Sequence, residues 1–395
     1  MRVRPDLPRR ADLVIIGGGV VGAATAFFAS RAGLRPLLIE ARPHLCTLTT
    51  PRATGAFRLQ FDNREELELV RESVDLFLNF REATRQRAYD LAVRQQGYLW
   101  LTTSAEGAER QRRQVERQHG WGLTDVELLT GDEVRGRFPY VGPNVVQGRF
   151  RAEDGFLDTV ALTLGLAEAS RGEMVLETPV TGFRVAGGRL EAVISRSTAV
   201  ATSQAVVACG PLSGVVAGVA GADLPLRTVR RQKLVMPDVP EVPQDAPMTI
   251  DEETGTHWRP ALFGAWLLCT EPNTPPSPPS WNVPADRDFG LRLLDPASPV
   301  AAARIVPFWS DVWDRGEQNW YVEAGQYTMT PDHRPLIGET RIEGLYVNSG
   351  YSGHGIMGSP AGSRILVDVL TGRLRPEDNP FRVDREFVHR ELDRL

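Results

Sequence analysis

The stretch ADLVIIGGGVVG, residues 11–22, decides the fold of this chain. Its apolar residues 13–16 predict a buried β-strand that leads directly into a G-x-G-x-x-G turn. In such a turn Gly17 allows the tight bend, Gly19 lets the backbone approach a pyrophosphate, and Gly22 lets helix and strand pack closely. The stretch therefore predicts the beginning of a dinucleotide-binding site.

The residues that follow complete a strand–turn–helix–strand unit. Residues 23–32 are rich in alanine and predict a helix, whose N-terminal N–H groups attract phosphate. A second apolar strand, residues 36–39, ends in Glu40, 18 residues after the third glycine of the turn. Glu40 is placed to accept hydrogen bonds from the ribose of an adenosine. We add Val20 and Val21, which lie inside the turn, to the predicted cofactor-binding residues.

Composition excludes several classes of function. The 395 residues suffice for two or three domain-sized units, and a net charge of −5 gives no basic surplus for binding nucleic acid. No run of 18 apolar residues predicts a membrane-spanning helix. Cys46, Cys209 and Cys269 are odd in number and far apart, which predicts neither a metal site nor a disulfide framework and favours a cytoplasmic protein.

Further elements follow from apolar spacing and turn residues. The pattern predicts one amphipathic helix over 62–90, a strand over 98–101, and a charged helix over 105–119. Asp158 is a predicted N-cap for a helix over 159–169.

The middle of the chain reads as strands and loops. Short strands are predicted between 174 and 208, with a hairpin turn at Gly187 and Gly188. The proline-rich stretch 271–284 predicts a loop, which is either a lid or an exposed connection.

A second glycine-rich turn lies near the end of the chain. Residues 349–358, SGYSGHGIMG, join a predicted strand over 344–348 to a predicted helix over 359–371. This turn offers consecutive backbone N–H groups and a second helix N-terminus. Because one phosphate turn is already assigned, the second indicates a long ligand whose redox ring lies elsewhere. Flavin adenine dinucleotide (FAD) fits that pattern better than a nicotinamide cofactor.

Three blocks of sequence carry a resemblance to a known family, in the family's order and over nearly the whole chain. The chain resembles the flavin-dependent amine oxidases, which include sarcosine oxidase, glycine oxidase and D-amino-acid oxidase. Sarcosine oxidase and the β subunit of its heterotetrameric form are the most similar branch. The blocks are residues 11–40, residues 178–193 with 205–211, and residues 327–338 with 344–362.

The resemblance implies an α/β fold with two parts. A Rossmann-like FAD-binding domain would be discontinuous, and an inserted α+β substrate-binding domain would contain a mostly antiparallel sheet. We predict 1–85, 150–228 and 330–395 for the FAD-binding domain, and 86–149 and 229–329 for the substrate-binding domain.

The resemblance also implies which residues hold FAD. Val180 would hold the adenine through its backbone, the loop with Thr49 and Thr50 would contact the pyrophosphate, and residues 353–357 would lie beside the pyrimidine edge of the flavin. The cofactor-binding residues implied in this way are Ala41, Arg42, Thr49, Thr50, Ala53, Thr54, Gly55, Val180, Cys209, Gly210, Gly353, His354, Gly355, Ile356 and Met357.

The substrate site differs from that of monomeric sarcosine oxidase. Met357 stands where that enzyme has a lysine for the substrate carboxylate, so Arg58 becomes the predicted carboxylate clamp. Tyr327 matches a tyrosine that closes the pocket and donates one hydrogen bond. Trp258 either lines the pocket, with His257 beside it, or packs in the core. His354 is the histidine expected closest to the chemistry.

The oxygen-activating lysine of the family has no counterpart at its expected position. That position falls near Leu267 and Leu268. The only lysine of the chain, Lys233, lies on a different predicted strand and reaches the flavin only if that strand passes under the ring. Oxidase and dehydrogenase activity therefore both remain open.

The resemblance implies FAD-dependent oxidation of a small secondary amine acid, most like sarcosine. Hydride transfer to the flavin would give an imine, hydrolysis would give an amine and an aldehyde, and O2 would be reduced to hydrogen peroxide. The alternatives are an amino-acid dehydrogenase or another N-methyl amino acid oxidase, either of them also as one subunit of a complex, and a non-enzymatic flavoprotein assembly factor. The oligomeric state is open between a monomer, a homo-oligomer and a hetero-oligomer.

The flavin is predicted to be non-covalent. Gly325 stands where monomeric sarcosine oxidase has the cysteine that tethers its flavin, and no other cysteine is close in sequence. Acid precipitation of the purified protein should release all yellow colour into the supernatant. A precipitate that stays yellow after washing would contradict this prediction.

Overall fold

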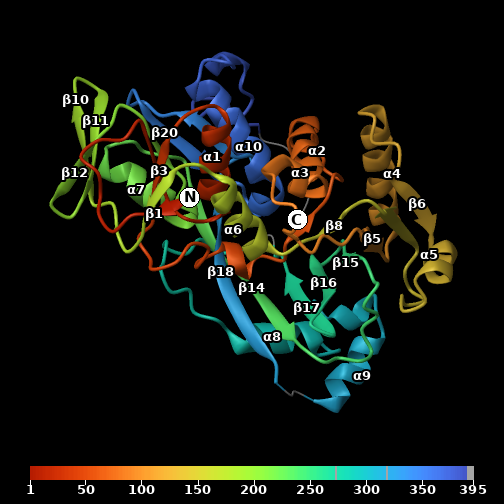
Figure 1. The fold of residues 1–395 in the computed structure, drawn as a ribbon. Coiled ribbons are helices and arrows are strands. Elements are labelled where there is room, and N and C mark those ends of the chain that lie inside the picture. Colours follow the sequence, from red (N-terminus) through yellow and green to blue (C-terminus); the bar gives the residue numbers. More distant parts are fainter. Residues whose placement is uncertain (272–273, 317–318, 389–395) are drawn as a thin grey trace.

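The structure is a computed structural model that describes residues 1–271, 274–316 and 319–388. The strand that precedes the first glycine turn belongs to a sheet of seven strands (Figure 1). Its strands pair in parallel, except for the antiparallel pair at one edge. In spatial order the strands are β1 (Arg2–Val3), β9 (Glu173–Val175), β3 (Pro36–Ile39), β2 (Leu13–Ile16), β13 (Ala205–Val207), β20 (Leu345–Ser349) and β19 (Leu336–Glu339).

Apolar side chains cover both faces of this sheet. Leu13 and Ile15 of β2 pack toward α1 (Val20–Arg31) and α10 (Gly355–Leu370), whereas the alternate residues of β2 pack toward α7 (Ser213–Val219) and a small antiparallel sheet. A parallel strand buried on both faces requires a continuous apolar run. The small sheet consists of β10 (Gly182–Ala186), β11 (Arg189–Ser195) and β12 (Thr198–Ala201).

Both glycine turns are shorter than predicted, because the helices begin inside them. α1 begins at Val20 rather than at residue 23, and α10 begins at Gly355 rather than at residue 359. Gly22 and Gly358 were read as turn residues, but neither has the positive φ of a turn glycine. The free N–H groups of each helix therefore begin within the glycine-rich segment itself.

The single helix predicted over 62–90 is wrong. Two helices take its place, α2 (Arg64–Leu78) and α3 (Phe80–Thr84), with a break at Asn79. The amide of Asn79 donates to the backbone carbonyl of Asp75 at 3.0 Å. Asparagine competes in this way with the helical hydrogen bonds, which apolar spacing does not reveal.

A second large sheet has eight strands and is mostly antiparallel. The pair β5–β15 is its only parallel pair. In spatial order the strands are β18 (Tyr321–Met329), β14 (Arg227–Met236), β17 (Gly264–Cys269), β16 (Thr256–Ala261), β15 (Met248–Asp251), β5 (Tyr98–Thr102), β7 (Gln147–Arg151) and β6 (Glu127–Thr130).

Two helices pack on one face of the eight-stranded sheet. This face carries Leu234, Trp258 and Leu267, which form an apolar core with α8 (Arg287–Leu294) and α9 (Phe308–Arg315). In Figure 1 these helices lie at the end of β14 and β18 that is farthest from the seven-stranded sheet. The remaining elements are α4 (Ala105–Gly120), α5 (Gly131–Arg137), α6 (Thr159–Ala169), β4 (Ala56–Phe57) and β8 (Gly155–Phe156).

The predicted fold class is confirmed. The chain has a Rossmann-like α/β part and a part with a mostly antiparallel sheet. The helix capped by Asp158 is also present, because a carboxylate oxygen of Asp158 accepts from two backbone N–H groups of the first turn of α6. We retain the division into two domains as a proposal, supported by the strands that each large sheet contains; residues 389–395 lie outside the described residues.

Within the described ranges, the helices are too short or too polar to cross a lipid bilayer.

The packing of Gly22 gives a test of the fold. A Cβ at this position would lie 1.9 Å from the carbonyl oxygen of Gly17, so Gly22→Ala should destabilise the protein by about 3 kcal/mol and weaken FAD binding. Gly136→Ala is the matched control, because Gly136 lies inside α5 with nothing near its Cβ position, and it should raise stability by up to about 1 kcal/mol. Chemical denaturation of both variants measures the difference. Equal stability of the two variants would contradict the close approach.

Candidate functional site

The first of two cavities, the nucleotide cavity, has a volume of about 240 Å³. It lies at the carboxyl ends of β2, β3 and β13, where ligands bind in open α/β sheets. The predicted cofactor-binding residues that line it are Gly17, Gly19, Val20, Val21, Glu40, Ala41, Thr49, Thr50, Val180, Cys209 and Gly210.

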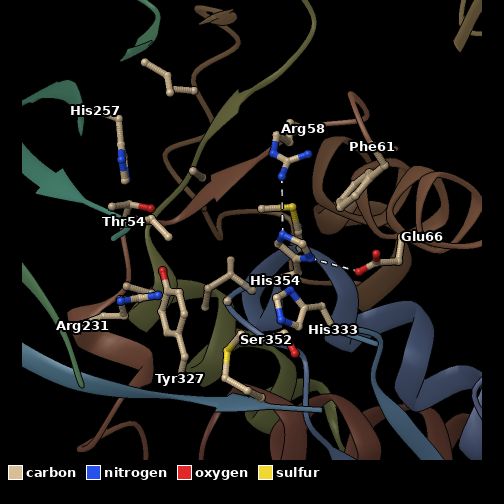
Figure 2. Close-up of a pocket in the computed structure, with 18 of the residues that line it drawn as sticks. Thr54, Arg58, Phe61, Glu66, Arg231, His257, Tyr327, His333, Ser352 and His354 are labelled. Atoms are coloured by element: carbon tan, nitrogen blue, oxygen red, sulfur yellow. Dashed lines mark hydrogen bonds and ion pairs between the residues drawn. The ribbon is translucent and has the colours of Figure 1, made fainter. Parts of the chain in front are cut away.

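The second cavity, the central cavity, has a volume of about 270 Å³. It lies between the N-terminus of α10 and the face of the eight-stranded sheet opposite Trp258 (Figure 2). The predicted site residues that line it are Ala53, Thr54, Gly55, Arg58, Tyr327, Gly353, His354, Ile356 and Met357.

One segment connects the two cavities. Thr49 and Thr50 line the nucleotide cavity, and Ala53, Thr54 and Gly55 line the central cavity a few residues later. A short 3-10 turn from Thr50 lies between the two groups. A ligand with a nucleotide at one end and a ring at the other can therefore follow this segment from one cavity into the other.

Three predicted cofactor-binding residues line neither cavity. Gly22 lies behind the first turn, against the carbonyl of Gly17, where it acts through packing. Arg42 follows the carboxylate of Glu40, to which its backbone N–H donates at 2.8 Å. Gly355 is the first residue of α10.

The nucleotide cavity fits a pyrophosphate. Gly17 has φ +113°, and a Cβ there would lie 2.5 Å from the carbonyl oxygen of Ala208, so only glycine allows the turn to pass so close to β13. Gly19 is the N-cap of α1 and supplies no side chain to cap the helix. The N–H of Val20 donates to Oγ1 of Thr50 at 3.3 Å, and the rest of the first turn of α1 is left for an anionic ligand.

The carboxylate-bearing residue Glu40 also lines the nucleotide cavity. One carboxylate oxygen accepts from the backbone N–H of Gly18 at 2.6 Å, and the other accepts from that of Arg42 at 2.8 Å. Burial raises the pKa of Glu40, and these backbone hydrogen bonds oppose the rise. The carboxylate thus holds the glycine turn and the end of β3 together beside the expected ribose.

Arg58 and His354 meet in the central cavity, with Glu66 behind them (Figure 2). Nδ1 of His354 donates to Oε1 of Glu66 at 3.0 Å, and Nη2 of Arg58 lies 3.5 Å from Nε2 of His354. Because guanidinium groups only donate, Nε2 is the acceptor in this contact and Nδ1 carries the proton. The buried carboxylate of Glu66 therefore fixes the tautomer of His354, and His354 in turn orients Arg58.

Aromatic rings surround the same arginine. The guanidinium carbon of Arg58 lies 4.6 Å from the centre of the Phe61 ring and 5.3 Å from that of Trp100. Arg58 is only 2% exposed. A guanidinium that stacks on rings keeps its N–H edge for planar, charged partners such as a carboxylate.

Sequence reasoning missed Glu66, which it placed on the charged outer face of a helix. Asn63 is the N-cap of α2, and its side chain accepts from the N–H of Glu66 while its amide donates to Oε2 of Glu66 at 2.8 Å. The spacing Asn63-x-x-Glu66 is a capping-box pattern, which turns the glutamate back toward the start of the helix. That signal could have placed Glu66 inside. Burial would raise the pKa of Glu66, but the hydrogen bonds from His354 and Asn63 and the charge of Arg58 keep it below its usual value.

Tyr327 forms the opposite wall of the central cavity. Gly353 has φ +105°, and a Cβ there would lie 2.6 Å from the ring of Tyr327, so the second glycine turn presses directly against this tyrosine. Burial raises the pKa of Tyr327. Its hydroxyl therefore stays protonated near neutral pH and can donate a hydrogen bond.

Trp258 does not line the central cavity. It is 1% exposed and packs against Tyr140, Phe308 and Trp309 in the apolar core. Side chains alternate across β16, so His257 lines the cavity in its place. Burial lowers the pKa of His257 to about 4, and its Nδ1 donates to the carbonyl of Gly255 at 2.9 Å. His257 is therefore a neutral ring at neutral pH.

The only lysine lies on the strand next to Leu267 and Leu268, the position at which the resemblance implies an oxygen-activating lysine. Lys233 of β14 pairs directly with Leu268 of β17. Its ammonium lies 3.0 Å from a carboxylate oxygen of Glu323 and 3.8 Å from the centre of the Trp266 ring. Lys233 does not line the central cavity.

The proline-rich segment 271–284 lies beside both cavities, although residues 272–273 are outside the described residues. Thr274 lines the central cavity and Trp281 lines the nucleotide cavity. The side chain of Gln326 holds the segment between them, because it accepts from the N–H of Ser280 at 2.9 Å and donates to a proline carbonyl at 2.7 Å. The interpretation as a lid stays a prediction.

Metal binding finds no support in the described part of the chain, where no group of three or more histidine, cysteine or acidic side chains could hold an ion. Cys46 and Cys209 line the nucleotide cavity, and Cys269 lies buried in β17. None of these cysteines lines the central cavity.

Comparison with known proteins identifies the family. The model of the family described as "DAO: FAD dependent oxidoreductase" matches residues 12–369. The chain belongs to this family. The family of FAD-dependent oxidoreductases accounts for both glycine turns, and FAD fits the two connected cavities described above.

Similar proteins extend over nearly the whole chain. "FAD-dependent oxidoreductase domain-containing protein 1" of Xenopus laevis is 26% identical over 411 residues, which cover 92% of this chain and 79% of the relative. Mitochondrial dimethylglycine dehydrogenase of Mus musculus is 26% identical over 384 residues, which cover 92% of this chain but only 43% of that enzyme. The crystal structure of L-proline dehydrogenase from P. horikoshii has a TM-score of 0.80 at 22% identity, covers 96% of each chain, and shows the same fold.

The buried Glu66 predicts a stability change that depends on pH. Glu66→Gln should lower the free energy of unfolding near pH 7 by about 2 kcal/mol, because it removes the charge of the carboxylate that accepts from Nδ1 of His354. The pKa of Glu66 is lowered in the folded state, so this contribution is complete above the unfolded value of 4.5 and is lost as the pH falls through the folded pKa.

Denaturant titrations of the wild type and Glu66→Gln between pH 3 and pH 8 measure the effect. The difference between the two proteins should be constant above about pH 5 and should shrink below about pH 4.5. A difference that does not change over this range would show that the carboxylate is not ionised in the folded protein.

Proposed function

We propose that this protein oxidises a small secondary-amine amino acid, most like sarcosine, with non-covalent FAD as its cofactor. The observation that carries the proposal is Arg58, a buried arginine held by His354 and Glu66 at the wall of the central cavity. Its guanidinium can pair with a carboxylate through two parallel hydrogen bonds. The relationship to dimethylglycine dehydrogenase, whose name specifies an N-methylated glycine, supports this substrate class.

Bound FAD supplies a hydride acceptor for the carbon next to the substrate nitrogen. The residues of the chain bind and orient the amino acid. Arg58 holds the carboxylate, Tyr327 donates one hydrogen bond from the opposite wall, and His257 adds a neutral ring beside the amine. A neutral ring does not repel an amine, and the buried walls exclude water from the reacting atoms. The imine product then hydrolyses, which for sarcosine gives glycine and formaldehyde.

The N-terminus of α10 would hold the pyrimidine edge of the flavin. His354 is the N-cap residue of α10 and makes no side-chain cap to the helix, because its ring is bound to Glu66. The backbone N–H groups of the first turn are therefore left for a partner with negative charge. Met357, in that same turn, lines the cavity without any charge of its own.

Dehydrogenase activity is the second candidate. Lys233 is paired with Glu323 and does not line the central cavity, and no other lysine exists in the chain. The described residues of the cavity thus offer no ammonium group for the reaction with O2. We propose that oxygen reoxidises the flavin slowly and that another electron acceptor takes its place. A partner subunit and a cytoplasmic location also stay predictions.

Substitution of Arg58 tests the proposal. Arg58→Met should raise the KM for sarcosine about 100-fold, because a hydrogen bond to a charged group contributes about 3 kcal/mol. The effect on sarcosine amide, which lacks the carboxylate, should be much smaller. Anaerobic reduction of the flavin, followed by its absorbance, measures both. Equal effects on the acid and the amide would remove Arg58 from the carboxylate-binding role.

The absorbance of the flavin also separates the two candidate activities, oxidase and dehydrogenase. Mixing the substrate-reduced protein with oxygenated buffer should give reoxidation far slower than turnover with an artificial electron acceptor. Reoxidation by O2 that keeps pace with turnover would establish an oxidase instead. No reduction by any N-methyl or D-amino acid of a panel would overturn the proposed activity.

A further inference from the structure

Arg231, like Arg58, is an arginine whose side chain lines the central cavity. It lies on β14, directly opposite Gly325 of β18, and it shares the cavity face of the strand with Arg227 and Val229. Figure 2 shows Arg231 beside Tyr327 on one side of the cavity and Arg58 with His354 on the other. The cavity therefore has a guanidinium group at each of two walls.

The two arginines differ in how their charge is balanced. Glu66 lies close to Arg58, and the attraction between them is one reason for the lowered pKa of Glu66. For Arg231 the described residues supply a single hydrogen-bond acceptor, the hydroxyl of Thr274, and no carboxylate within 4.0 Å. Its Nε is buried and has no acceptor among them.

The acidic residue that attracts Arg231 is already paired with another arginine. Glu271 attracts Arg231 from a distance, but its carboxylate accepts from Arg292 at 3.2 Å. Burial lowers the pKa of Arg231, and attraction to Tyr327, Cys269 and Glu271 opposes this only in part. Burying a cation without a counter-charge is costly, and an anionic ligand beside it would recover part of that cost.

We propose that Arg231 binds a second carboxylate of the substrate, so that the preferred substrate is a secondary amine that carries two carboxylate groups. Arg58 holds the carboxylate next to the reacting carbon, and Arg231 holds the other one at the opposite wall. Tyr327 lies beside Arg231 on that wall, with its ring centre 5.8 Å from the guanidinium carbon (Figure 2). This inference rests on the proposed function, because it assigns the substrate class of the same cavity.

Binding of unreactive acids to the FAD-loaded protein tests the inference without turnover. Succinate and propionate differ by one carboxylate, and each perturbs the flavin absorbance when it binds nearby. The dissociation constant of succinate should be at least about tenfold lower than that of propionate, which corresponds to about 1.4 kcal/mol. Arg231→Met should abolish most of this difference, and Arg231→Lys, which keeps the charge, should retain part of it.

Arg227→Met is the matched control. Arg227 lies on the same face of β14 and lines the same cavity, but it is exposed, and its substitution should change the ratio of the two dissociation constants less than about threefold. An equal loss in Arg227→Met and Arg231→Met would show that only the general positive field of the wall matters, and the inference would fall. Equal binding of succinate and propionate to the wild type would also overturn it.

Flavin reduction then separates this inference from the proposed function. Sarcosine, N-methylaspartate and N-(carboxymethyl)glycine are compared under anaerobic conditions. A higher kcat/KM for the two dicarboxylates, lost in Arg231→Met, supports the inference. Efficient reduction by sarcosine alone would overturn the binding of a second carboxylate but would leave the proposed function in place. If Arg231→Met shifts the flavin reduction potential and slows all three substrates equally, Arg231 acts on the flavin, and the inference is wrong.

Discussion

The contact between Gly22 and the carbonyl of Gly17 sets the position of α1 at the nucleotide cavity. It brings the first turn of α1 down onto the end of β2, so that the N–H groups of the helix open into the nucleotide cavity. The same turn receives the carboxylate of Glu40 through the N–H of Gly18. A larger residue at either glycine would move the helix away from the strand, and the cavity would lose its shape.

The central cavity depends on a different constraint, which is the balance of buried charge. Glu66, His354 and Arg58 come from α2, from the cap of α10 and from the segment after β4, and hydrogen bonds join them into one unit. Such a unit is stable only when every member is paired, because an isolated charge is expensive inside a protein. Arg231 has no such unit around it within the described residues, and this difference marks it as a place where a ligand supplies what the protein lacks.

Much of the fold could be predicted from local signals. Apolar runs before the two glycine turns predicted β2 and β20 and the helices that follow them, because a buried parallel strand needs a continuous apolar run. The errors came from local competition that spacing does not show. Asn79 breaks the helix predicted over 62–90, and Gly22 and Gly358 take part in helices although their type indicated turns.

The amino-acid sequence alone determined the cofactor class and the α/β fold, through its two glycine turns and through its resemblance to a known family. Only the tertiary structure decided which side chains meet. Because side chains alternate between the two faces of β16, Trp258 points into the core and His257 into the central cavity. The tertiary structure also brings Glu66 and Arg231, from distant parts of the chain, to walls of the same cavity. Local sequence carries no information on such encounters, because they depend on strand register and on how helices and sheets pack together.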